Sequence, residues 1–336
     1  MVTKTGMRIR LFQAMGCVLG VTIPCALLVA QAHAAATSPG KFVMRVLEIP
    51  DINRGAGLAI VLQTPGGRTY LYDTGTGYPD KDGWASDHNS GRDLIAPFLR
   101  QRGVKELDGV IISHAHYDHF GGLVWLVDNF PIKKIFDCGY RFGGKSDANY
   151  TAELAHYDKL RERFKQRPGV YQAAHAGDKL ALDDGLDVEV IAPPKEFFHE
   201  LHPEKRPKND PAAHYMLNTN SLMLRIRHGQ IVFLLPGDIE LEDQVKNLLP
   251  SVPREKLKCD ILVAPGHGLH SAPEFADATR PQVTVASVFT RWARNCSARR
   301  VFGAVGSKVY VTGLHGNVQV VSDGQRYEIT TQREAE

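Results

Sequence analysis

The chain has 336 residues, and its 40 Lys and Arg slightly outnumber its 37 Asp and Glu. The whole surplus lies in residues 1–34, which contain Lys4, Arg8 and Arg10 and no acidic residue. The remaining 302 residues therefore carry no net charge. Because proteins that bind nucleic acid generally show a basic surplus, nucleic acid is not favoured as a partner.

Residues 1–34 predict a secretory signal peptide. Basic residues precede an apolar stretch at 11–30, and Ala32-His33-Ala34 has the small-x-small pattern of a cleavage site. An apolar stretch of this length can also span a bilayer, so a retained anchor is the alternative. We expect cleavage because Pro24 interrupts the stretch, and hence a periplasmic or secreted protein with no membrane span after processing.

Three cysteines follow the expected signal peptide: Cys138, Cys259 and Cys296. Their number is odd and their spacing wide, which predicts neither a disulfide framework nor a Cys-x-x-Cys zinc site. We expect them to be buried and to act as small hydrophobic side chains.

Residues 35–336 mix strand and helix patterns without repeats or a linker, which predicts one mixed α/β domain. In its first half we expect helices at 92–103, 122–130 and 150–169, and strands at 41–49, 58–64, 68–75, 108–114 and 132–136. In its second half we expect a helix at 239–250 and strands at 186–193, 259–264, 282–288, 308–313 and 317–324, with a strand–turn–strand pair at 221–238. The Pro-, Lys- and His-rich segment 193–217 reads as a loop that is too polar for the core.

Acidic residues and histidines follow four of the predicted strands. The strand ends carry, in chain order, Asp73, the segment from His114 to His119, Asp238 and His267. Side chains at the tips of buried strands are held by a rigid scaffold and are still reachable by solvent.

The segment SHAHYDHFGG at 113–122 has a spacing that suits metal ions. In an extended backbone, side chains two residues apart point the same way, so His114 and His116 can bind one ion. Asp118 and His119 are adjacent and diverge, so they can serve a second ion nearby. Imidazole and carboxylate ligands without thiolate suit zinc, with manganese or iron as alternatives.

The stretches LYDTG, SHAHYDHFGGL, FLLPGD and APGHG, in this order and spacing, resemble the metallo-β-lactamase superfamily. Within it, residues 95–123, the Asn-x-x-Ser at 218–221 and the tail at 308–324 resemble the hydrolase domain of the ComEC/Rec2 competence proteins. The resemblance extends over essentially all of residues 35–336. It implies a four-layer αβ/βα sandwich, in which helices cover two packed sheets and a dinuclear metal site lies at one edge.

The resemblance also implies the roles of the candidate residues. His114 and His116 would bind the first metal ion, and Asp118, His119 and His267 would bind the second. Asp238 would bridge the two ions, and Asp118 and Asp238 are the carboxylates expected to act in catalysis. Asp73 would support the site by hydrogen bonding.

Two departures from the family pattern matter. Most of the superfamily has a third histidine for the first ion, just before the strand that begins near Ser221, whereas this chain has Asn218, as the ComEC-like subgroup does. His214, four residues earlier, is the alternative ligand. In addition, segments 53–59 and 266–270 differ from the competence-protein pattern, so we expect different substrate contacts.

Two divalent ions can hold a bridging hydroxide at neutral pH and can stabilise the oxyanion that forms when it attacks. We therefore expect a metal-dependent hydrolase of phosphoesters, phosphodiesters in particular, with basic residues of segment 193–217 facing the substrate. Two alternatives stay open: a lactonase- or β-lactamase-type hydrolase, and a non-catalytic metal- or partner-binding protein. A serine hydrolase built on Ser113 is not favoured, because no histidine–carboxylate arrangement around it is visible.

Overall fold

The computed structural model describes residues 40–50, 57–77, 88–144, 148–202 and 212–334. The expected signal peptide at 1–34 lies outside these ranges, as do Lys205, Arg206 and Lys208 of the predicted polar loop. Within the ranges, no helix has both the length and the apolar character needed to cross a membrane.

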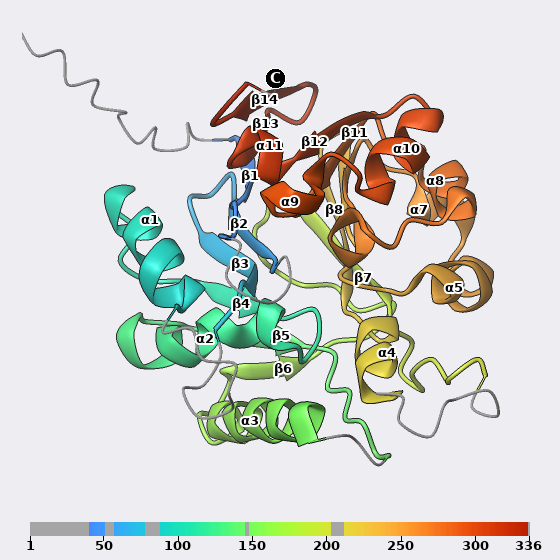
Figure 1. Ribbon diagram of the computed structural model, residues 1–336. Coiled ribbons are helices and arrows are strands. Elements are labelled where there is room, and N and C mark those ends of the chain that lie inside the picture. Colours follow the sequence, from blue (N-terminus) through green and yellow to red (C-terminus); the bar gives the residue numbers. More distant parts are fainter. Residues whose placement is uncertain (1–39, 51–56, 78–87, 145–147, 203–211, 335–336) are drawn as a thin grey trace, which may run out of the picture. The chain divides into compact units, whose positions relative to one another are not determined.

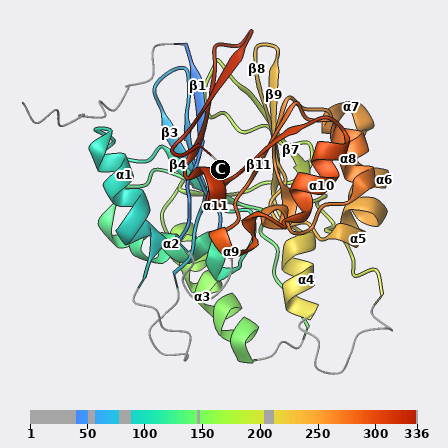
Figure 2. The same cartoon turned by 45° about the horizontal axis from the view of Figure 1, so that its top comes forward.

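Two β-sheets lie face to face in the described domain, and helices cover the outer face of each (Figure 2). The first sheet has eight strands in the order β14-β13-β1-β2-β3-β4-β5-β6. Its strands are β1 (Phe42–Val46), β2 (Ala59–Gln63), β3 (Thr69–Thr74), β4 (Gly109–Ile111), β5 (Ile135–Asp137), β6 (Tyr171–Ala173), β13 (Val318–Ser322) and β14 (Tyr327–Thr331). Pairing is antiparallel from β14 to β3 and parallel from β3 to β6.

The second sheet has six strands in the order β12-β11-β10-β9-β8-β7. Its strands are β7 (Asp187–Ala192), β8 (Met223–His228), β9 (Ile231–Leu235), β10 (Ile261–Val263), β11 (Val283–Ala286) and β12 (Lys308–Val311). The strands β9 to β12 run parallel to one another. The carboxyl ends of parallel strands meet at one edge of a sheet, which is where the polar residues of the predicted site are found.

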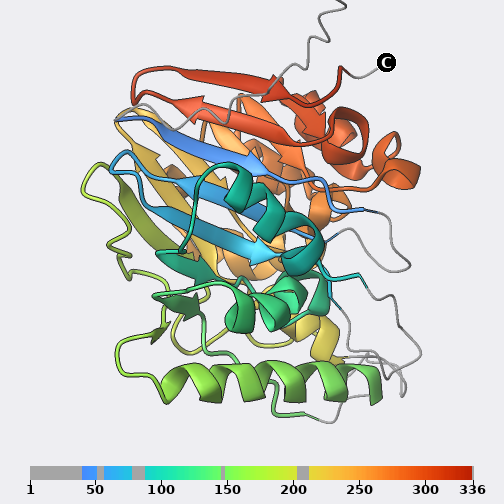
Figure 3. The same cartoon turned by 90° about the vertical axis from the view of Figure 1, so that its left-hand side faces the viewer.

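The helices form the two outer layers (Figure 1). Against the first sheet lie α1 (Ala96–Gln101), α2 (Tyr117–Asn129) and α3 (Ala148–Lys165), seen from that side in Figure 3. The second half of the chain contributes α4 (Ala212–Thr219), α5 (Leu241–Asp243), α6 (Leu249–Ser251), α7 (Arg254–Leu257), α8 (Pro273–Thr279), α9 (Thr290–Ala293), α10 (Ser297–Ala304) and α11 (Thr312–His315). Short π-helical segments at Gly91–Ile95 and Gln244–Leu248 and a 3-10 turn at Pro265–Gly268 complete the described helical elements.

Three hydrophobic layers separate these elements. The central layer lies between the sheets and includes Phe42, Tyr72 and Phe233. A second layer packs the first sheet against α1, α2 and α3, and a third packs the other sheet against α7, α8 and α10. Helix, sheet, sheet and helix in succession confirm the predicted four-layer αβ/βα sandwich.

Most predicted elements are found near their expected positions, but two predictions were wrong in part. The metal-binding motif bends at residues 113–115 and only His116 is shown with an extended backbone, and Asp118 and His119 lie in the first turn of α2 rather than in a loop. The segment 193–217 is not loop throughout, because α4 begins within it and buries Met216 and Leu217. The three cysteines are free and buried, as predicted.

Candidate metal centre

The predicted ligands converge where strands from both sheets end. Asp118, His119, Asp238 and His267 form the tighter part. The Nε2 atoms of His119 and His267 lie 3.2 Å apart, and Asp238 Oδ2 lies 3.3 Å from the former and 2.9 Å from the latter. Asp118 Oδ2 lies 3.4 Å from His267 Nε2. Four side chains that can bind a metal ion thus face a common point.

His114 and His116 form the other part. His114 Nε2 lies 2.8 Å from His116 Nδ1, so the two ring nitrogens face each other. One ligand atom from each of His114, His119 and Asp238 falls within 4.8 Å of the others, which joins the two parts of the site. Asp238 therefore lies between the two parts of the site.

Asp73 contacts the His119 ring on the side that faces away from the other ligands. Its Oδ2 lies 2.8 Å from His119 Nδ1, and its Oδ1 accepts a hydrogen bond from the Ser113 backbone N–H at 2.7 Å. This contact fixes one proton on Nδ1, so Nε2 is the nitrogen that a metal ion would bind. Asp73 is fully buried, as its predicted supporting position requires.

Two residues of the site have a left-handed backbone. The φ angle is 57° at both Asp73 and His267. Such conformations cost free energy outside glycine and are typical of functional sites, where surrounding contacts enforce them. At His267 the conformation follows Gly266, whose own φ is 53°, and turns the imidazole towards the cluster at the end of β10.

Ser113 is a structural link and not a nucleophile. Its buried hydroxyl lies 2.7 Å from Asp73 Oδ2 and 2.9 Å from His114 Nδ1. If the hydroxyl donates to the carboxylate, its oxygen accepts a hydrogen bond from His114 Nδ1–H, and the lone pair of His114 is then on Nε2. A carboxylate and histidines thus do surround Ser113, but its side chain is fully buried, so a substrate cannot reach the hydroxyl.

The four imidazoles of the site form two pairs, one with lowered and one with raised pKa values. Burial, and the neighbouring rings, hold the pKa values of His114 and His116 well below the ordinary value, so both are neutral at pH 7. Burial also opposes protonation of His267, but Asp238 and Asp118 outweigh it and raise its pKa to about 9. The pKa of His119 is likewise raised well above its usual range, because Asp238 and Asp73 outweigh burial.

The residues fit divalent cations. Asn218 Oδ1 and Asp238 Oδ1 are buried and have no hydrogen-bond partner in the described part of the chain. Buried acceptors without donors are costly, and a cation satisfies them.

Sequence reasoning missed two residues next to the cluster, Glu240 and His270. Glu240 Oε1 accepts a hydrogen bond from Asn218 Nδ2 at 2.7 Å, and its Oε2 lies 2.6 Å from His270 Nδ1. Their short spacing from predicted ligands could have indicated them. Glu240 follows Asp238 by two residues, and His270 follows His267 by three. His214 lies beside the site, and its ring stacks on that of His116 with centroids 4.7 Å apart.

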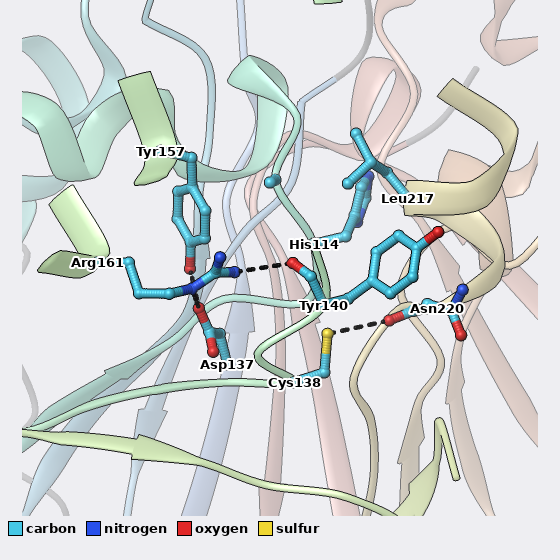
Figure 4. Close-up of a pocket in the computed structure, with 9 residues that line it drawn as sticks. His114, Asp137, Cys138, Tyr140, Tyr157, Arg161, Leu217 and Asn220 are labelled. Atoms are coloured by element: carbon cyan, nitrogen blue, oxygen red, sulfur yellow. Dashed lines mark hydrogen bonds and ion pairs between the residues drawn. The ribbon is translucent and has the colours of Figure 1, made fainter. Parts of the chain in front are cut away.

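A small cavity borders His114 on the side of β5 (Figure 4). Its volume is about 10 Å³, which admits at most one water molecule. The buried pair Arg161–Asp137 forms one wall, with Arg161 Nε 2.8 Å from Asp137 Oδ2 and the Tyr157 hydroxyl donating to the same oxygen at 2.9 Å. This cavity is too small for a substrate, and we interpret its polar wall as structural support for the end of β5.

The comparison with known families agrees with this geometry. The family model of the metallo-beta-lactamase superfamily matches residues 52–254, and the chain belongs to that superfamily. The resemblance drawn from the sequence is therefore confirmed.

Similar curated proteins include two with competence-related names. The chain is 24% identical to ComE operon protein 3 of Bacillus subtilis (strain 168) over 249 residues, which cover 72% of this chain and 28% of that protein. It is 25% identical to competence protein ComA of Neisseria gonorrhoeae over 236 residues, which cover 69% of this chain and 26% of that protein. The matched region thus spans about a quarter of the length of these relatives.

Among solved structures, a diphosphatase of the PhnP family is similar with a TM-score of 0.41 and 14% identity, covering 84% of this chain and 97% of that chain.

Proposed function

We propose that the protein is a dinuclear metal-dependent hydrolase of phosphoesters, with phosphodiesters as the preferred class. The observation that carries the proposal is the convergence of six side chains, four of them neutral or protonated imidazoles and two of them carboxylates, around adjacent points. The ligands would be His114, His116, Asp118, His119, Asp238 and His267, with zinc as the first choice and manganese or iron as alternatives.

When bound, two divalent ions supply Lewis acidity and a hydroxide nucleophile at neutral pH, and they suit the in-line displacement of a phosphoester. The protein's own groups provide the rest. Asp73 orients His119, and Ser113 and Ser221 both contact His114 Nδ1, at 2.9 and 3.3 Å. These contacts direct the metal-binding nitrogens inwards before an ion arrives, which lowers the cost of organising the site.

The surroundings favour an anionic substrate. His270 is 40% exposed, and Glu240 raises its pKa, which favours a positively charged imidazole next to the site. His270 packs against Gly266, the neighbour of His267, because a Cβ atom at Gly266 would lie 2.9 Å from His270 Cγ. The other ring N–H of such an imidazole would donate a charge-assisted hydrogen bond to an anionic phosphoester oxygen, a stronger contact than one to a neutral lactone.

The test is a substrate screen on protein with measured metal content. We expect turnover of nitrophenyl phosphodiesters, and loss of at least a hundredfold in kcat/KM in the variants Asp118→Ala and Asp238→Ala. Lactones and β-lactams are the comparison substrates. Full metal loading with turnover of lactones alone, or with no turnover, would contradict the proposal.

We also propose that residues 1–34 direct export and are removed, leaving a periplasmic or secreted enzyme of residues 35–336. Mass spectrometry of protein recovered from a bacterial periplasm tests this, and an intact residue 1 would contradict it.

A further inference from the structure

Glu240 has both carboxylate oxygens occupied by side chains from other parts of the chain. Asn218, in α4, donates to Oε1, and His270, beyond β10, contacts Oε2. Glu240 is 8% exposed, so water competes little for these contacts. A buried carboxylate with two partners at 2.6–2.7 Å holds both of them in one orientation.

The contact with Glu240 decides which way the Asn218 amide points. A carboxylate only accepts hydrogen bonds, so the amide nitrogen must face Glu240 and the amide oxygen must face away. That oxygen is buried and has no hydrogen-bond partner among the described residues. An amide oxygen left in this state is costly unless a ligand completes it.

Residues on either side of Asn218 contact the His114–His116 pair. His214 and Asn218 are four residues apart on α4 and therefore share one face of the helix. The ring of His214 stacks on His116, and three residues after Asn218 the Ser221 hydroxyl lies 3.3 Å from His114 Nδ1. Contacts on both sides of Asn218 thus reach this histidine pair.

His214 is less suited to share an ion with His116. The planes of the two rings differ by only 29°, so one ring covers the face of the other. The metal-binding lone pairs of an imidazole lie in the plane of its ring. Stacked rings therefore direct their lone pairs side by side, whereas two ligands of one ion must direct them to one point.

We propose that the Glu240–His270 pair holds Asn218 with its amide oxygen as the third protein ligand of the first metal position, beside His114 and His116. Glu240 is then a positioning residue. The inference rests on the dinuclear centre of the proposed function. It implies a first position that binds its ion more weakly than the second, because a neutral amide oxygen replaces an imidazole or carboxylate.

The decisive variant is Glu240→Gln. The oxygen of the introduced amide would face His270, so its NH₂ group would face Asn218. The Asn218 amide then flips to accept this hydrogen bond, and its own NH₂ group faces the metal position. We expect the first-site affinity to fall about 10- to 100-fold while the second ion still binds. The measurement is titration of chelator-treated protein with Co²⁺, followed by visible absorption, with stoichiometry from elemental analysis.

A compensating pair separates positioning from general structural support. In the double variant Glu240→Gln/Asn218→Asp, one oxygen of the carboxylate introduced on α4 accepts a hydrogen bond from the amide introduced in place of Glu240. The other oxygen of that carboxylate faces the first position. We expect this double variant to recover the wild-type first-site affinity or exceed it. A role that is merely structural would show no such recovery.

Glu242→Gln is the matched control. Glu242 lies two residues from Glu240, is exposed and pairs with His202 and Lys246, so we expect unchanged binding of both ions. Asn218→Ala provides a second route if Glu240→Gln does not fold, and it should lose the first ion alone.

The inference is overturned if Glu240→Gln and Asn218→Ala bind two ions like the wild type, or if His214→Ala alone loses the first ion. These readouts need no substrate. Metal results as expected, without phosphoester turnover, would therefore refute the proposed function and support this inference.

Discussion

At the scale of single residues, His119 shows how the site depends on groups that do not themselves face the ligand cluster. Asp73 accepts one hydrogen bond from His119 Nδ1 and two hydrogen bonds from Ser113. An amide at position 73 cannot accept all three, because its nitrogen only donates. The orientation of His119 is thus controlled by a residue 46 positions away in the chain.

Asp73→Asn should therefore weaken the second metal position. We expect metal affinity there to fall about 10- to 100-fold, with a parallel loss of activity. Competition with a chromophoric chelator measures the affinity. Asp128→Asn is the control, because Asp128 is an exposed partner of Arg163, and an equal loss in both variants would contradict the explanation.

Metal binding should release protons at neutral pH. In the metal-free protein the pKa of His267 is raised to about 9, chiefly by Asp238 against the effect of burial, so its ring is protonated at pH 7. A metal ion needs the neutral imidazole, so apparent affinity should rise as pH increases to about 9 and level off above it. Calorimetry in buffers of different ionisation enthalpy counts the released protons. Equal release at pH 7 and pH 10 would contradict the assignment.

At the scale of elements, the close packing of α2 places the metal-binding motif. Gly121 and Gly122 lie inside this helix, where glycine is normally unfavourable. A Cβ atom at Gly122 would lie 2.1 Å from the Thr74 carbonyl oxygen, and one at Gly121 would lie 2.1 Å from the Gly77 backbone nitrogen. The two glycines therefore let α2 pack against the end of β3 and the residues just after it. Asp73 lies at that end of β3.

Gly122→Ala should destabilise the fold although alanine is the better helix former. Backbone atoms cannot move aside as a flexible side chain can, so we expect a loss of about 2–3 kcal/mol in the free energy of unfolding. Urea denaturation gives the value. Gly303→Ala on α10 is the matched control, because a Cβ there meets nothing within 4 Å, and it should be neutral or stabilising by about 0.5–1 kcal/mol.

At the scale of the whole described domain, the two sheets depend on one shared core. Phe42 of the first sheet and Phe233 of the second meet edge to face, with ring centroids 4.9 Å apart. The site takes Asp73 and the His114–His119 segment from one sheet and Asp238 and His267 from the other. The metal centre can therefore form only when this core holds the sheets together.

Phe233→Ala should lower the free energy of unfolding by about 3–5 kcal/mol, because the buried ring is replaced by a cavity. Chemical denaturation followed by circular dichroism measures the change. Leu241→Ala is the control, since Leu241 is exposed and its loss should cost less than about 0.5 kcal/mol. Similar values for the two variants would contradict a core position for Phe233.

The sequence by itself determined the class of fold and predicted the six side chains that converge at the candidate metal centre. Strand alternation is a local property, and the motif at 113–122 places four ligands within six residues, so both were visible without coordinates. The order and spacing of the superfamily motifs then added Asp238 and His267 to the predicted ligands.

Only the tertiary structure decided how these groups are oriented and supported. The helical start of α2 within the motif and the presence of α4 in a polar segment depend on distant packing partners, which sequence periodicity does not contain. The contacts of Glu240 with Asn218 and His270 join three separate segments. Side-chain direction at such meeting points is set by long-range contacts, and these exist only once the chain has folded.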